Sequence, residues 1–176
     1  DLNGDSIVVY YISEDKSQNF VLRSMDDIAK LKDINDDFGF MNEMYETLSY
    51  LLNSETATSM LKEVIEGENV GLDVDYSNDL GSTRFNLISN TLMYYPYDGL
   101  ITKEGGYQSA SIGFIHELAH KIKSLKSIDA YYDELEREDP DFSNQNERSA
   151  ITEYENKVVG ELNSKGFEES KRYDHK

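Results

Sequence analysis

The chain contains no cysteine, and its 17 lysines and arginines face 35 aspartates and glutamates. Without cysteine the fold cannot depend on disulfides, and cysteine nucleophiles are excluded. A metal site would have to be built from histidine and carboxylate, a ligand set that suits a catalytic site better than a structural one.

The scarcity of positive charge leaves a formal net charge of −18. Phosphate backbones and anionic membrane surfaces repel such a polyanion, so we expect no nucleic-acid binding and no membrane insertion. No hydrophobic run approaches the length of a membrane span. The charge allows a basic partner without requiring one.

The length of 176 residues predicts a single domain with a core of its own. The hydrophobic share is only 38%, but 13 tyrosines and 7 phenylalanines supply bulk. The sequence starts with Asp1 instead of Met and shows no signal peptide, so we expect a fragment or a processed product. Residues 164–176 are predicted to form a polar tail.

Strand and helix patterns mix in the first part of the chain and helical patterns dominate the rest, which predicts an α+β fold. A small mixed or antiparallel sheet is expected near the N-terminus. Ser24 and Asn146 are expected as helix N-caps, and residues 133–146 as an acidic loop. Strands are predicted at 6–12, 19–22, 70–76, 85–88 and 91–95, and helices near 56–67, 111–122 and 147–163.

The most informative stretch is SIGFIHELAHKI, residues 111–122, which contains the pattern H-E-x-x-H on a predicted helix. His116 and His120 lie four residues apart, on one helical face and about one turn from each other, so both imidazoles can bind one Zn²⁺. Glu117 is then placed to take a proton from a metal-bound water. The alternative is a pair of ordinary surface histidines. Gly113, one turn earlier, could leave room for substrate or could serve helix packing.

A tetrahedral metal site needs a third protein ligand. The candidates on the last predicted helix are Glu147, Glu153 and Glu155, and His175 lies beyond that helix. Glu147 and Glu153 are six residues apart and point in different directions, so only one of them is expected to reach the ion.

The sequence resembles the bacterial effector zinc metallopeptidases typified by the NleD effector, over most of its length. The shared features are H-E-x-x-H, the segment ERSAI at 147–151, the pair EN at 155–156 and the strand TLMYYP at 91–96. The resemblance implies a zincin-like helical half with Glu147 as the third zinc ligand. It also makes Arg172 and Tyr173 candidates for stabilising an oxyanion, although the family usually spaces these two residues apart.

Residues 1–5, DLNGD, resemble the end of the repeat-associated core in Rhs-type polymorphic toxins. That resemblance implies a C-terminal toxin domain that is secreted or delivered into a target cell and held by a cognate immunity protein. The predicted function is therefore a zinc endopeptidase that cleaves a protein of a host or competitor cell. Two alternatives use the same chain: a metal-dependent hydrolase of a non-peptide amide, and a degenerate peptidase fold that serves as a protein-interaction domain.

Overall fold

The computed structural model describes residues 6–10, 19–68, 70–76, 83–97 and 99–175, and it confirms the α+β class. Among these residues no helix is both long and apolar enough to cross a membrane. The elements are β1 (Ile7–Tyr10), β2 (Asn19–Leu22), the 3-10 helix η1 (Met25–Asp33), α1 (Phe40–Leu51), α2 (Glu55–Glu66), β3 (Leu72–Tyr76), β4 (Arg84–Asn86), β5 (Thr91–Tyr94), β6 (Leu100–Ile101), β7 (Tyr107–Gln108), α3 (Ala110–Lys126), α4 (Ile128–Glu136), β8 (Glu138–Asp139), β9 (Ser143–Asn144), α5 (Gln145–Ser149), the π-helix η2 (Ala150–Glu155) and α6 (Asn156–Ser164).

The main sheet has five strands in the order β2-β1-β3-β5-β4. The central pairs β1–β3 and β3–β5 are parallel, whereas β2 and β4 join antiparallel at the two edges. The predicted strands are therefore confirmed in a mixed sheet, although several are shorter than expected. Parts of two predictions, residues 11–12 and the turn at 77–82, lie outside the described residues. Strand β4 ends the sheet on the side of the predicted metal site.

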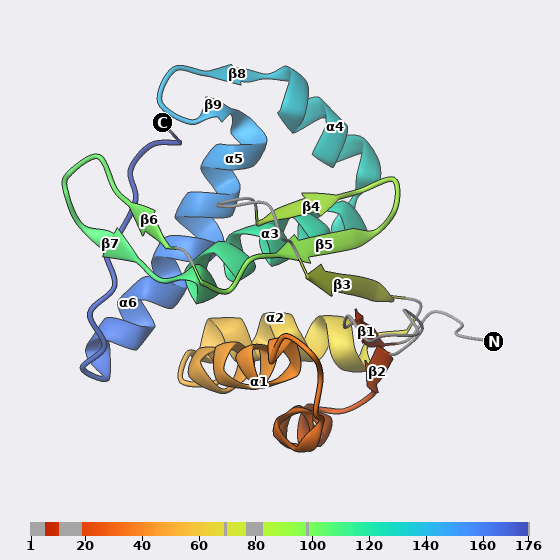
Figure 1. Cartoon of the computed structure of the whole chain (residues 1–176). Coiled ribbons are helices and arrows are strands. Elements are labelled where there is room, and N and C mark those ends of the chain that lie inside the picture. Colours follow the sequence, from red (N-terminus) through yellow and green to blue (C-terminus); the bar gives the residue numbers. More distant parts are fainter. Residues whose placement is uncertain (1–5, 11–18, 69, 77–82, 98, 176) are drawn as a thin grey trace.

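Helix α3 lies at the centre of the molecule, in contact with β4, β5, β7, α1, α2, α4 and η2 (Figure 1). Its apolar residues recur every three or four positions, so one face is buried against these elements. The same burial takes in His116 and His120, each only 5% exposed. The alternative of ordinary surface histidines is therefore wrong. The buried residues of α3 are Ile112, Phe114, Ile115, His116, Leu118, Ala119, His120, Lys121 and Ile122.

The prediction of an acidic loop at 133–146 is wrong, because α4 and the hairpin β8–β9 occupy most of it. Helix α4 begins where the Ser127 hydroxyl accepts a hydrogen bond from the Ala130 N–H, and Tyr131 anchors it in the interior. The N-cap of the following helix is Asn144, whose Oδ1 accepts from the Glu147 N–H at 2.9 Å. Asn146 was the predicted cap, but it is the second residue of α5 and is buried.

The predicted polar tail is bound to the rest of the chain. The Glu169 carboxylate accepts hydrogen bonds from the Tyr50 hydroxyl at 2.7 Å and from the Ser109 N–H at 2.9 Å. Ser109 directly precedes α3, so this carboxylate also sits at the positive end of the helix dipole. Further along, the Ser170 N–H donates to the Tyr107 carbonyl at 2.9 Å. The tail is thus fixed beside the hairpin β6–β7, which the sequence did not predict.

Because the Glu169 carboxylate is buried and hydrogen-bonded, we expect substitutions at this position to lower thermal stability. Glu169→Gln places an amide donor against the Tyr50 and Ser109 donors, and losing such bonds costs about 1–3 kcal/mol. For a chain of this size each kcal/mol lowers Tm by about 2–4 °C. Thermal unfolding should show this loss, while Glu168→Gln, an exposed neighbour, should melt like the parent. Equal melting of both variants would mean that the tail does not stabilise α3.

Candidate metal centre

Three side chains converge beside the middle of α3. The Nε2 atoms of His116 and His120 lie 3.2 Å apart. The Glu147 carboxylate reaches both rings, with Oε2 at 3.1 Å from His116 Nε2 and Oε1 at 3.5 Å from His120 Nε2. One ligand atom of each residue lies within 4.8 Å of the others, so this group could hold a metal ion.

The spacing of these donors fits a single ion. Ligand atoms about 2.0–2.2 Å from a tetrahedral centre lie about 3.3–3.6 Å from one another. The two Nε2 atoms are 3.2 Å apart, and each lies near a different oxygen of the Glu147 carboxylate, at 3.1 and 3.5 Å, so the distances come near that spacing. The remaining corner of the tetrahedron would stay open to a water molecule or a substrate, as in catalytic sites with three protein ligands.

Both imidazoles are oriented from behind by acceptors at Nδ1. His116 Nδ1 lies 3.0 Å from Glu155 Oε2, and His120 Nδ1 lies 2.6 Å from Asn146 Oδ1. These oxygens can only accept, which favours the tautomer with Nδ1–H and directs the lone pair of Nε2 towards the group. Arg172 Nη2 also lies 3.0 Å from His116 Nδ1. Outer partners of this kind fix the tautomer and the orientation of metal-binding histidines.

The group therefore brings together electron-pair donors that cannot satisfy one another. Among the described residues, Glu147 Oε2 is buried and has no hydrogen-bond partner. Two histidine nitrogens, on His116 and His175, lie 3.1 Å from it, but neither meets it with hydrogen-bond geometry. A buried carboxylate oxygen beside imidazole nitrogens requires positive charge nearby, and this is the observation on which the fit of a metal depends.

The electrostatics of the group also favour a cation. Burial would lower the pKa of His116, but Glu147 and Glu155 outweigh it and raise the pKa to about 9. Burial would raise the pKa of Glu147, yet the two histidines lower it. Without a metal, a proton on His116 provides the missing positive charge, and a metal ion would compete with that proton.

A π-helical turn allows two glutamates to reach the same histidine. Glu147 and Glu155 are eight residues apart, which in an α-helix is about 800°, or about 80° beyond two full turns. The π-helix η2 (Ala150–Glu155) has i→i+5 hydrogen bonds and winds less per residue, so it removes this excess. Glu147 then faces Nε2 of His116 while Glu155 faces Nδ1. Such insertions are rare and often occur at functional sites.

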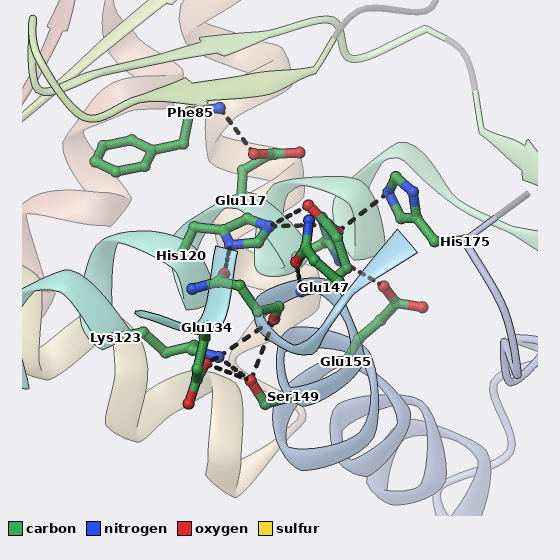
Figure 2. A network of polar contacts seen from close by, with 12 residues as sticks. Phe85, Glu117, His120, Lys123, Glu134, Glu147, Ser149, Glu155 and His175 are labelled. Atoms are coloured by element: carbon green, nitrogen blue, oxygen red, sulfur yellow. Dashed lines mark hydrogen bonds and ion pairs between the residues drawn. The ribbon is translucent and has the colours of Figure 1, made fainter. Parts of the chain in front are cut away.

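Glu117 lines a cavity of about 210 Å³ together with His116. Its Oε2 accepts a hydrogen bond of 2.8 Å from the Phe85 N–H of the edge strand β4 (Figure 2). The strand thereby fixes this carboxylate, which shares the cavity lining with His116. The other residues that line the cavity are Thr83, Gly99, Leu100, Gln108, Ser109, Ala110, Gly113, Glu155, Arg172 and His175.

The tail residues that the sequence singles out lie at different places around the site. Arg172 donates to Glu155 Oε2 at 2.6 Å and so supports the partner of His116. Tyr173, predicted as a site residue, is 62% exposed and does not line the cavity. His175 does line it, with Nε2 3.1 Å from Glu147 Oε2 and its ring stacked on that of His116. Glu153, the rival of Glu147, is exposed on η2 and lines a different pocket.

A second tier of contacts ties together the helices that carry the ligands. The Lys123 ammonium on α3 contacts Glu134 of α4, the hydroxyl of Ser149, and the carbonyl oxygen of Asn146 at 3.2 Å (Figure 2). Asn146 in turn orients His120 and directly precedes Glu147. The Lys123 contacts therefore hold α5 against α3 at the point where their ligands meet.

The sequence did not reveal the outer partners of the histidines. The sequence predicts Asn146 as a helix cap, and it offers Glu155 and His175 only as candidates for the third metal ligand. The one available signal was the EN pair at 155–156: Asn156 exchanges two hydrogen bonds with the Arg172 backbone, at 2.6 and 2.9 Å, and so directs the tail to the site.

Comparisons of the chain with protein-family models, with curated proteins and with solved structures found no match. The NleD-like family therefore stays a prediction from the sequence. What the chain does must be argued from the geometry of its own site.

Glu147 should be indispensable for metal binding. Among the residues that the structure describes, Glu147 alone has a carboxylate near both Nε2 atoms. Zinc affinity of Glu147→Gln, measured by calorimetry, should therefore fall more than the about 10–100-fold typical of residues that orient the ligands from behind. Glu153→Gln is the matched control and should bind zinc with the parent affinity. The reverse result, with Glu153→Gln as the defective variant, would reject Glu147 as a ligand.

Proposed function

We propose that this chain is a zinc-dependent endopeptidase, with His116, His120 and Glu147 as the zinc ligands and Glu117 as the general base. The observation that carries the proposal is the convergence of two buried histidines and the half-buried Glu147. One of these histidines, His116, also lines an open cavity together with the Glu117 carboxylate. A His₂Glu set with an open fourth position is the ligand pattern of hydrolytic zinc sites.

The proposed roles follow from the chemistry of each group. A zinc ion held there would supply Lewis-acid polarisation of the scissile carbonyl and would lower the pKa of water. Glu117 accepts a proton from the attacking water as the water oxygen bonds to the carbonyl carbon. The C–N bond then breaks, and Glu117 returns the proton to the leaving nitrogen. The products are a carboxylic acid and an amine, and Glu117 is restored.

Two features support a polypeptide substrate. The cavity of about 210 Å³ is smaller than pockets that enclose a whole small ligand, which measure about 300–1,000 Å³. It therefore suits a part of a larger molecule. Strand β4 is an edge strand, and Thr83 just before it lines the cavity. An extended chain can pair with such an edge, which would carry its backbone past Glu117.

In this proposal the oxyanion is stabilised by His175, a role that the sequence suggested for Arg172 or Tyr173. His175 lines the cavity, and its Nε2 lies near Glu147 Oε2. It is not one of the three residues that could hold the metal ion. Its Nε2 can therefore donate to an oxygen that approaches the open side of the group. Arg172 acts through Glu155 and His116 as a positioning residue.

The general-base role gives a direct test. Glu117→Gln should bind zinc like the parent but lower kcat by about 10²–10⁴-fold, because the amide cannot accept the proton. Cleavage would be followed as new N-termini in a proteome-derived peptide library, with and without a chelator. Undiminished cleavage by Glu117→Gln would exclude this mechanism. Hydrolysis confined to non-peptide amides in parallel assays would exclude a peptidase.

His175 and Tyr173 form a matched pair of tail variants. His175→Ala should retain zinc affinity and lower kcat by about 10²–10³-fold, the usual cost of removing one oxyanion donor. Tyr173→Phe should behave like the parent, because that ring lies outside the cavity. A loss of zinc affinity in His175→Ala would identify His175 as a ligand instead.

The biological setting is proposed from sequence resemblance alone. An effector or toxin role inside a target cell, and a cognate immunity protein, agree with the peptidase proposal. The five residues that suggest an Rhs-type origin, 1–5, lie outside the described residues.

A further inference from the structure

Gly113 is a helix-interior glycine that packing does not explain. It lies on α3, three residues before His116 and four before Glu117, and so on the same helical face one turn away. Glycine is among the least favourable residues in a helix, and alanine would be the better choice for stability. Some other requirement must therefore account for a glycine here.

The space around Gly113 identifies that requirement. A Cβ atom built on Gly113 meets no heavy atom within 4 Å, so no neighbouring element needs the glycine for close packing. Gly113 nevertheless lines the cavity that holds His116 and Glu117. Gly99, on the same cavity, is different: a Cβ there would lie 2.1 Å from the Gln108 carbonyl oxygen, so packing alone explains it.

The lining of the cavity combines charged and uncharged residues. Glu155 and Arg172 contact His116, so with Glu117 they make the metal end charged. The other lining residues are uncharged, and they include Ala110, one turn before Gly113 on α3, and Leu100 of the hairpin β6–β7. An uncharged recess about 5.4 Å, or one helical turn, from the general base would receive a side chain next to the scissile bond.

We propose that Gly113 forms the floor of a subsite that accepts one large apolar side chain beside the scissile amide. The proposal deepens the peptidase function and rests on it. The substrate side chain fills the space that a side chain at position 113 would otherwise occupy. Substrate selection then depends on the size of residue 113, and metal binding does not.

Gly160 provides a matched control. It is also inside a helix, α6, but it does not line the cavity, and a Cβ there would make only an ordinary contact of 3.8 Å with Lys171. Gly113→Ala and Gly160→Ala should each raise Tm by about 2–4 °C, since alanine favours the helix. Both variants should bind zinc like the parent.

Only the Gly113 variants should change substrate choice. In a proteome-derived peptide library the parent should cleave next to large apolar residues. Gly113→Ala should lower kcat/KM for such sites by about 10–200-fold, the range for one methylene in an apolar pocket. Gly113→Leu should shift cleavage to sites with glycine or alanine, and Gly160→Ala should leave the preference unchanged.

Binding provides a readout that does not need turnover. Zinc-loaded Glu117→Gln protein, immobilised, should enrich library peptides with a large apolar residue, and Gly113→Leu in that background should abolish the enrichment. Peptide binding or cleavage with the same side-chain preference in all variants would overturn the subsite alone. Failure of the zinc-loaded protein to bind or cleave any peptide would overturn the peptidase function and the subsite together.

Discussion

The site is governed by the cost of placing several carboxylates close together where they are wholly or partly buried. Glu147 and Glu155 flank His116 on opposite ring nitrogens. Glu117 lines a cavity together with His116 and Glu155. A buried charge without a partner costs several kcal/mol, so positive charge must be brought to it. Arg172 neutralises Glu155 from the tail. The remaining deficit lies at the three converging donors, where it is met by a proton on His116 or by a metal ion.

This need for positive charge explains why the site is assembled from segments far apart in sequence. The histidines come from α3, Glu147 from α5, Glu155 from η2 and Arg172 from the tail, so the group exists only in the folded chain. A metal that binds only this form would stabilise the fold by mass action. The tail takes part in the site directly, because Asn156 fixes the backbone of Arg172 at the end of the π-helical turn.

The part of the site that could be predicted is the part encoded by local spacing. His116 and His120 share a helical face because they are four residues apart, and that geometry needs no tertiary information. The α+β class and most of the strands follow from hydrophobic periodicity in the same way. The roles of Asn146 and Glu155 could not be predicted, because they depend on how α5 packs on α3 and on a π-helical turn that propensity does not indicate. The sequence did not predict the helix at 128–136, because Tyr131 is its only buried residue and the segment therefore shows no apolar helical face.

Helix α3 has to meet two demands that conflict. As the central helix it needs residues that favour helix and burial, and it has them at Ile115, Leu118 and Ile122. As the helix of the metal group it must also leave open space beside His116, and at Gly113 it does so at the expense of helix stability. The apolar packing of the remaining face offsets that loss. A glycine whose added Cβ would meet no neighbour, on the central helix of the fold, is therefore the feature that supports the proposed subsite.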